Sequence, residues 1–261
     1  MIKHALVTGA VLAALAAKAI APAHAGGSLK DEVAPPADPV HYFRFEAGAA
    51  WSDADDATWV SPGGARGWWD VDGDTSLMLG VAVGRNLMPG LRGDVSFGAI
   101  LDHEHDGCRI PGGAGNVPDC GSATVESSVD TYLLLANIFI EPLTLMGHGG
   151  GAFRPFLTAA AGVAWNDMDG WTRIEPGAPQ PIRNFSGNTE TNFAWALGGG
   201  VAVDLTQMFG RSVMLDVTYR YIDAGEARGG LNPDVGAGIP QEALNYDLQF
   251  HTVTAGVRIP F

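Results

Sequence analysis

Residues 212–225 read SVMLDVTYRYIDAG, and their apolar and polar side chains alternate at every second position. The apolar face holds Val213, Leu215, Val217, Tyr219 and Tyr221, and the other face holds Asp216, Thr218 and Arg220. Successive side chains of a β-strand point to opposite faces, so a period of two indicates a strand. This stretch therefore predicts a strand with one apolar and one polar face.

The same alternation predicts seven further strands, at residues 41–51, 75–84, 91–100, 130–142, 154–166, 192–205 and 251–261. The segment 130–142 is apolar on both faces, so a short helix also fits it. As a strand, it would turn Asn137 inward and the following residues outward: Tyr132, Leu134, Ala136, Ile138 and Ile140.

The connectors between these strands alternate in length. Long polar connectors are expected at 52–74, 102–124, 166–190 and 224–245, and shorter ones at 85–90, 141–152 and 206–211. Outer-membrane barrels have long extracellular loops and short periplasmic turns. Residues 40–261 are thus predicted to form an all-β fold, an eight-stranded antiparallel up-and-down transmembrane β-barrel with both termini in the periplasm.

The N-terminal segment has the features of an export signal. Residues 1–25 begin with Lys3, continue through an apolar stretch and end on the small-residue site Ala23-His24-Ala25, which predicts a cleavable signal peptide. An N-terminal membrane anchor is the alternative, but Lys18 interrupts the apolar stretch. Residues 26–39 are polar and rich in proline, and they are expected to form a periplasmic leader.

The composition argues against several partners. The net charge is −14, and removing Lys3 and Lys18 leaves 13 basic against 29 acidic residues, a net charge of −16. No basic patch is visible along the sequence, so nucleic acid and anionic lipid are poor candidates. The two cysteines, Cys108 and Cys120, are expected to form a disulfide in an exported protein. In the chain-entropy model it would contribute about 3 kcal/mol.

Charged residues within the predicted strands keep to the polar face. A soluble barrel of the lipocalin kind would have the same period with its apolar face inward, so the period alone does not decide between water and lipid outside. Charges facing lipid at mid-depth cost about 2–4 kcal/mol, which favours an interior ladder of ion pairs. Its predicted members are Arg44, Glu46, Arg92, Asp94, Asp216, Arg220 and Arg258. Such a ladder would fill the narrow barrel or, alternatively, line an ion or solute path.

Aromatic residues fall near the predicted strand ends, as the girdles at two membrane surfaces require. They are Trp51, Trp165, Tyr219, Tyr221 and Phe261.

Four segments together resemble the eight-stranded outer-membrane proteins of the Opa-like and outer-membrane immunogenic-protein type of Gram-negative bacteria. They are NIFIEP (137–142), RPFLTAAAGVAW (154–165), DVTYRYIDAG (216–225) and AGVRIPF (255–261). The resemblance implies that Phe261 is the terminal aromatic read by the barrel-assembly machinery. Pro260 departs from the usual ending and predicts looser pairing of the last strand with the first. Unlike proteins of the OmpA type, this chain is expected to carry no peptidoglycan-binding domain after the barrel.

Three groups of residues are candidate chemical sites. Asp70, Asp72 and Asp74 are spaced as the start of a calcium loop, with a solvated acidic loop as the alternative. His103, His105 and Asp106 suit a transition metal, with a polar strand end as the alternative. His251 is the candidate base of a lipid-modifying barrel enzyme, but its same-face neighbours include no serine. No enzymatic activity and no cofactor are expected.

Tryptophans crowd the first long connector: Trp59, Trp68 and Trp69. They would either anchor an extracellular partner or pack the loop onto the barrel rim. The leading hypothesis is an outer-membrane protein, in contact with membrane lipid, whose four long loops serve envelope integrity or adhesion. A narrow porin-like channel and a lipid-modifying enzyme are the alternatives.

Overall fold

The computed structural model describes residues 40–52, 57–148, 151–179, 181–234 and 238–261. The predicted signal peptide 1–25 and leader 26–39 lie outside the described residues. The described strands and helices are β1 (His41–Ser52), β2 (Ala57–Val60), β3 (Arg66–Gly73), β4 (Ser76–Met88), β5 (Leu91–Arg109), β6 (Asp119–Ile140), α2 (Pro142–Leu145), β7 (Phe153–Ile174), β8 (Ile182–Asp204), α3 (Thr206–Phe209), β9 (Met214–Arg228) and β10 (Glu242–Pro260).

Eight of these strands close into a ring. Neighbours pair antiparallel in the order β1-β4-β5-β6-β7-β8-β9-β10, and β10 pairs with β1 again. Closure leaves no edge strand in this ring, so the backbone groups of every strand have partners on both sides. The predicted all-β, eight-stranded antiparallel up-and-down barrel is confirmed.

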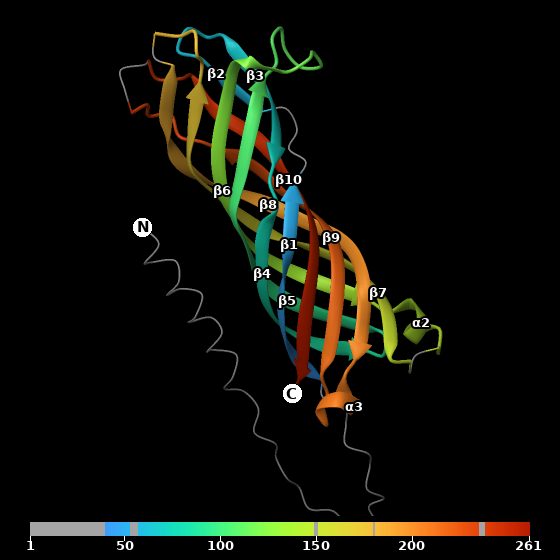
Figure 1. The fold of residues 1–261 in the computed structure, drawn as a ribbon. Helices are drawn as coiled ribbons and strands as arrows, with labels where there is room; N and C mark the ends of the chain where they lie inside the picture. Colours follow the sequence, from blue (N-terminus) through green and yellow to red (C-terminus); the bar gives the residue numbers. More distant parts are fainter. Residues whose placement is uncertain (1–39, 53–56, 149–150, 180, 235–237) are drawn as a thin grey trace, which may run out of the picture. The chain divides into compact units, whose positions relative to one another are not determined.

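The strands extend well beyond their predicted ends, and the prediction that the long connectors are loops is wrong. Much of 102–124, 166–190 and 224–245 continues β5 to β10, and 52–74 contains β2 and β3. β2 pairs with β10 beyond the end of β1, and β3 pairs with β5 beyond the start of β4. Together with the β2–β3 pairing, they continue the barrel wall above β1 and β4 (Figure 1).

The other end of the barrel carries short turns. Gly90, with φ of 80°, completes the two-residue turn between β4 and β5, and α2 and α3 fill the other two connectors (Figure 1). Pro260 pairs with Tyr42, and the Phe261 amide donates to the His41 carbonyl at 2.8 Å. The expected loosening at Pro260 is therefore wrong, because the ladder runs in register to the end of the chain.

Among the described residues, no helix is long and apolar enough to cross a membrane. The predicted disulfide is confirmed: Cys108 and Cys120 are bonded at the far end of the β5–β6 hairpin.

Candidate functional site: an apolar belt and a barrel extension

The outer face of the ring carries a continuous band of apolar side chains. Phe45 is 52% exposed, Leu79 42% and Val81 49%. Each of the eight ring strands contributes to this band, here called the apolar belt: Phe43, Phe45, Leu77, Leu79, Val81, Val83, Val95, Phe97, Leu134, Ile138, Ile140, Leu157, Phe193, Leu197, Val217, Tyr219, Val253 and Val257. The outward positions between these residues carry no Asp, Glu, Lys or Arg. A water-soluble monomer rarely exposes an apolar surface this extensive.

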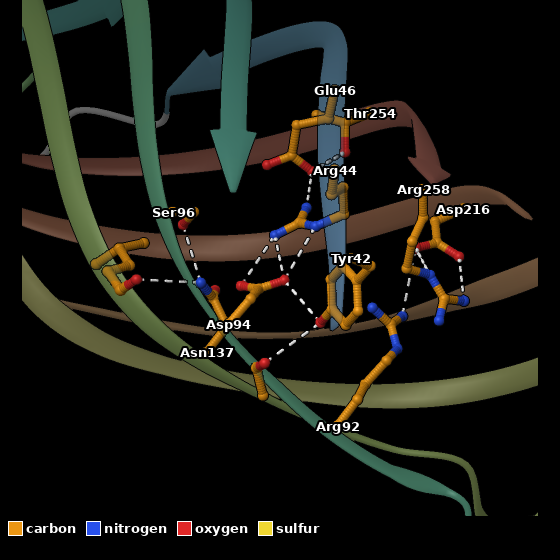
Figure 2. Close-up of polar contacts among 12 residues, drawn as sticks. Tyr42, Arg44, Glu46, Arg92, Asp94, Ser96, Asn137, Asp216, Thr254 and Arg258 are labelled. Carbon is orange, nitrogen blue, oxygen red and sulfur yellow. Dashed lines mark hydrogen bonds and ion pairs between the residues drawn. The ribbon is translucent and has the colours of Figure 1, made fainter. Parts of the chain in front are cut away.

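Behind the belt, the barrel interior combines buried charges with apolar side chains such as Leu133, Phe139 and Phe156. The structure buries the side chains of all seven charged residues predicted to face inward. Glu46 contacts both Arg44 and Arg220, the latter at 3.4 Å. Arg44 also pairs with Asp94 at 3.2 Å. Figure 2 shows Arg44 between the two carboxylates.

A second group of buried ion pairs centres on Asp216. Arg258 donates to it through Nε at 3.2 Å and Nη2 at 3.1 Å, and Arg92 Nη2 lies 3.4 Å away. The Arg92 guanidinium also stacks over the ring of Phe139, 3.9 Å from its centroid. Tyr42 links the two groups, since its hydroxyl donates to Asp94 at 3.1 Å and its ring lies under Arg92 and Arg258 (Figure 2).

The polarity reverses farther along the same strands. On β10, Arg258, Thr254 and Thr252 face inward in the belt, whereas Phe250, Leu248 and Leu244 are the buried residues beyond it. On β5, Glu104 and Asp106 face outward where Val95 and Phe97 did before. Beyond the belt, the barrel has the pattern of a soluble protein, with its apolar side chains inside and its charges outside.

This second part is called the barrel extension. It comprises β2, β3 and the ends of the ring strands beyond the belt: residues 103–109 of β5, 119–129 of β6, 166–174 of β7, 182–192 of β8, 224–228 of β9 and 242–250 of β10. Its interior is one apolar cluster that includes Trp59, Trp69, Val125, Trp171 and Leu244. The indole of Trp171 stacks on Phe185 with ring centroids 3.8 Å apart. A hydrophobic core therefore fills the extension, and it continues behind the belt at Met78, Leu133 and Leu135.

Aromatic side chains gather on the outer surface where the polarity changes. Trp51 stacks on His251 at 5.9 Å, and Trp195 lies 5.5 Å from Tyr221. Tyr219 donates to or accepts from His251 Nδ1 at 2.7 Å. Amphipathic rings of this kind suit a boundary between apolar and aqueous surroundings. At the short-turn end, Phe261 stacks on Phe43 at 4.6 Å.

A serine–histidine cluster lies inside the barrel at the same level. Ser52 Oγ is 2.7 Å from His103 Nε2 and 3.3 Å from His105 Nε2, and Ser76 Oγ is 2.7 Å from His103 Nδ1. Burial lowers the pKa of His103 to about 4, although Asp74 raises it. Burial and the nearby His103 lower the pKa of His105 to about 3. Both rings are therefore neutral at pH 7.

The candidate metal ligands do not point toward a common site in the described part of the chain. Asp70, Asp72 and Asp74 are exposed to solvent, as the solvated alternative predicts, but Asp70 and Asp72 lie on the strand β3 and not in a loop. His103 and His105 point into the barrel, whereas Asp106 points out. Within the described residues, no three His, Cys, Asp or Glu side chains are grouped to hold a metal ion. His251 lies on the outer surface with Tyr219 and Trp51.

The three tryptophans of the first long connector have different surroundings. Trp59 is 6% exposed and Trp69 1% exposed, and both belong to the core of the extension. Trp68 is partly exposed on the opposite face of β3. Of the two interpretations left open by the sequence, packing onto the barrel therefore describes Trp59 and Trp69.

One cleft opens in the wall of the extension, where β8 and β9 separate. Their pairing stops at Trp195 and Asp223, and the side chains of Asn166 and Asn192 donate to β9 carbonyls instead. The cleft measures about 720 Å³ and is lined by amides, hydroxyls and the ion pairs Arg66–Glu242 and Arg228–Glu226.

Sequence reasoning missed both the extension and the Ser52–His103 contact. The extension had a visible signal in residues 243–250, where Leu244, Tyr246, Leu248 and Phe250 alternate with polar residues. The Ser52–His103 contact had none, because its partners are 51 residues apart in the chain.

Comparison with known proteins gives structural likenesses only. No protein-family profile matches the sequence, and no curated protein matches it. The barrel is similar to several solved structures, three of which are described below. Neisserial surface protein A is 17% identical, with 84% of this chain and 97% of that chain covered and a TM-score of 0.41. The outer membrane protein OprG from Pseudomonas aeruginosa is 17% identical, covering 86% and 98%, with a TM-score of 0.47.

The third is Ail, the attachment invasion locus protein of Yersinia pestis, which is 9% identical, covering 84% and 99%, with a TM-score of 0.33. The fold assignment rests on the strand pairing of this chain itself: it is a closed eight-stranded β-barrel with an apolar outer belt and buried ion pairs inside it. The finer resemblance to the Opa-like and outer-membrane immunogenic proteins stays a prediction.

Proposed function

We propose that this chain is an outer-membrane protein with a structural or surface-interaction role, embedded in lipid through the apolar belt. The reversal of polarity along its strands carries the proposal. In the belt, apolar side chains face outward and ion pairs inward; in the extension, both are reversed. The outer face of the barrel would then suit lipid at the belt and water at the extension.

The physical chemistry of the bilayer supports this placement. In lipid each backbone donor and acceptor needs a partner within the protein, and a closed barrel supplies one. Barrels of this type place short turns in the periplasm and long elements outside the cell. The α2, α3 and Gly90 turns are therefore assigned to the periplasm and the extension to the cell surface. Phe261 would present its outward ring to the barrel-assembly machinery.

The extension would carry the activity that the sequence placed in four loops. Long paired strands, an apolar interior and the Cys108–Cys120 disulfide support a rigid platform. Such a platform suits contacts with other molecules at the surface, in adhesion or in envelope integrity. A channel is less well supported, because the charged interior is occupied by its own ion pairs.

Surface labelling of single cysteines tests the placement. In a Cys108→Ser/Cys120→Ser background, Asp72→Cys on the extension and Met208→Cys in α3 are both exposed positions. A membrane-impermeant maleimide should label Asp72→Cys in intact cells and Met208→Cys only after lysis. Equal labelling of both in intact cells, or a protein found in the soluble periplasmic fraction, would contradict the proposal.

A further inference from the structure

A small pocket at the tip of the extension concentrates positive charge in an acidic protein. It measures about 250 Å³ and lies between the β2–β3 hairpin and the ends of β5, β7 and β8. Four arginines line it with one carboxylate, Glu175: Arg66, Arg109, Arg173 and Arg183. The expectation that the chain lacks a basic patch is therefore wrong, because strands far apart in sequence bring these side chains together.

The carboxylates nearby do not balance this charge. Glu175 contacts Arg173 and lies 3.8 Å from Arg109. Arg66 pairs with Glu242 at 3.0 Å. Arg183 has no ion pair among those found within the described residues. Two carboxylates thus face four guanidinium groups at one end of the barrel, although the chain as a whole has a net charge of −14.

The arrangement is unfavourable for folding alone. Arg173 on β7 lies directly opposite Arg183 on β8, and like charges in that position destabilise a sheet. Arg173 is only 9% exposed, and burial lowers the pKa of its guanidinium; Glu175 raises this pKa, whereas Arg183 and Arg109 lower it. An anion placed between the two strands would reverse this repulsion.

The pocket also offers donors that the described part of the chain leaves unused. The Nε atoms of Arg173 and Arg183 and the indole Nε1 of Trp69 are buried without a hydrogen-bond partner there. The ring of Trp59 lies 4.9 Å from the Arg173 guanidinium and holds it in place. Guanidinium groups present a planar fork of donors that matches phosphate and similar oxyanions.

We propose that this pocket binds a tetrahedral oxyanion, a phosphate or sulfate group, between Arg173, Arg183 and Arg109. The oxyanion is either free in solution or an ester carried on a sugar. The proposal deepens the proposed function and rests on it for the biological setting, since the pocket would open at the cell surface. Binding itself is a property of the folded protein in any medium.

Titration of the purified protein in detergent tests this directly. Tryptophan fluorescence would report binding of inorganic phosphate, glucose 6-phosphate, glucose 6-sulfate and uncharged glucose at 0.15 M salt. The variant Arg183→Gln should weaken binding of the anions at least tenfold. The matched control, Arg211→Gln, removes an exposed arginine at the other end of the barrel and should leave binding unchanged.

A second measurement separates binding from folding. Without ligand, Arg183→Gln should unfold at the same or higher urea concentration than the unmodified chain, because it relieves the repulsion from Arg173. Tighter binding of the sugar esters than of inorganic phosphate would support an ester as the source, and equal binding would support the free anion. Binding of none of the three anions, equal binding by Arg183→Gln, or destabilisation of ligand-free Arg183→Gln would overturn the proposal. Cysteine labelling can fail while this binding persists, so the two proposals stand separately.

Discussion

Single side chains inside the belt show how closely charge is matched there. Glu46 accepts from Arg44, from both terminal nitrogens of Arg220 and from Thr254. Removing one partner of a buried ion pair leaves the other charge uncompensated, which is more costly than never having had the pair.

Replacing Glu46 with glutamine should therefore destabilise the barrel by about 3–5 kcal/mol. Urea unfolding in detergent, followed by the mobility of unboiled protein on a gel, measures the loss. The matched control Glu126→Gln removes a carboxylate from the exposed outer face of β6 and should change stability by less than about 0.5 kcal/mol. Equal unfolding midpoints for the two variants would show that the ion pairs are not what holds the interior.

The buried histidines give the extension a pH dependence with a defined sign. The pKa values of His103 and His105 are about 4 and about 3 in the fold, below the ordinary value of about 6.5 that the unfolded chain has. Between these values the unfolded chain binds more protons, so stability falls as the pH falls from 6.5 toward 4.

Hydrogen exchange of the Val71 and Val125 amides should accordingly speed up over that interval. His103→Gln should show a weaker dependence on pH, whereas His148→Gln, at an exposed position in a turn, should match the unmodified chain. Exchange rates independent of pH, after correction for intrinsic exchange, would mean that the two rings do not stay neutral in the fold.

At the scale of strands, the sequence predicted each ring strand but ended most of them too early. Each predicted strand extends only as far as its apolar residues stay on the same face. The period of two continues in 103–108 and 243–250 with the opposite face apolar or with polar residues on both faces. Such stretches lack the strand pattern that the sequence shows elsewhere, although in the structure they pair with neighbouring strands across β-bulges.

Some contacts lay beyond any reading of the sequence. The four arginines of the pocket, at positions 66, 109, 173 and 183, are far apart in the sequence, so no local cluster of basic residues predicts the pocket. The inward charges, by contrast, each showed their side through the alternation of their own strand. Local period therefore predicts which way a side chain points, whereas convergence of several strands depends on register.

The disulfide belongs to the β5–β6 hairpin and should stabilise that tip alone. In this hairpin, the backbone of Arg109 is paired with that of Asp119 on β6 and with that of Trp69 on β3. The double variant Cys108→Ser/Cys120→Ser loses about 3 kcal/mol of constraint on the opened hairpin. Trypsin cleavage after Arg109 should then speed up on the order of a hundredfold.

Cleavage after Arg211, in the turn at the other end, should proceed at the same rate in both proteins. The gel mobility of the unboiled variant should also stay that of a folded barrel. Loss of that mobility would indicate that the disulfide supports the whole barrel rather than its tip.

For the whole molecule, the packing of the interior predicts that no ion path runs through the barrel. Ion pairs and apolar side chains such as Phe139 and Phe156 fill the barrel behind the belt, and the apolar core of the extension lies beyond them. An eight-stranded barrel is only wide enough for its own side chains. Purified protein in a planar bilayer should therefore show no reproducible single-channel steps, whereas uniform ion-selective openings would favour the channel alternative.

The most direct test asks which solvent touches each part of the outer wall. Spin labels at Val81→Cys in the belt and Glu104→Cys in the extension, both in the Cys108→Ser/Cys120→Ser background, can be compared in lipid vesicles. The belt label should be relaxed by oxygen, which concentrates in lipid, and the extension label by a water-soluble nickel complex. Strong relaxation of the Val81→Cys label by the nickel complex would contradict a lipid-facing belt, and with it the membrane placement of the barrel.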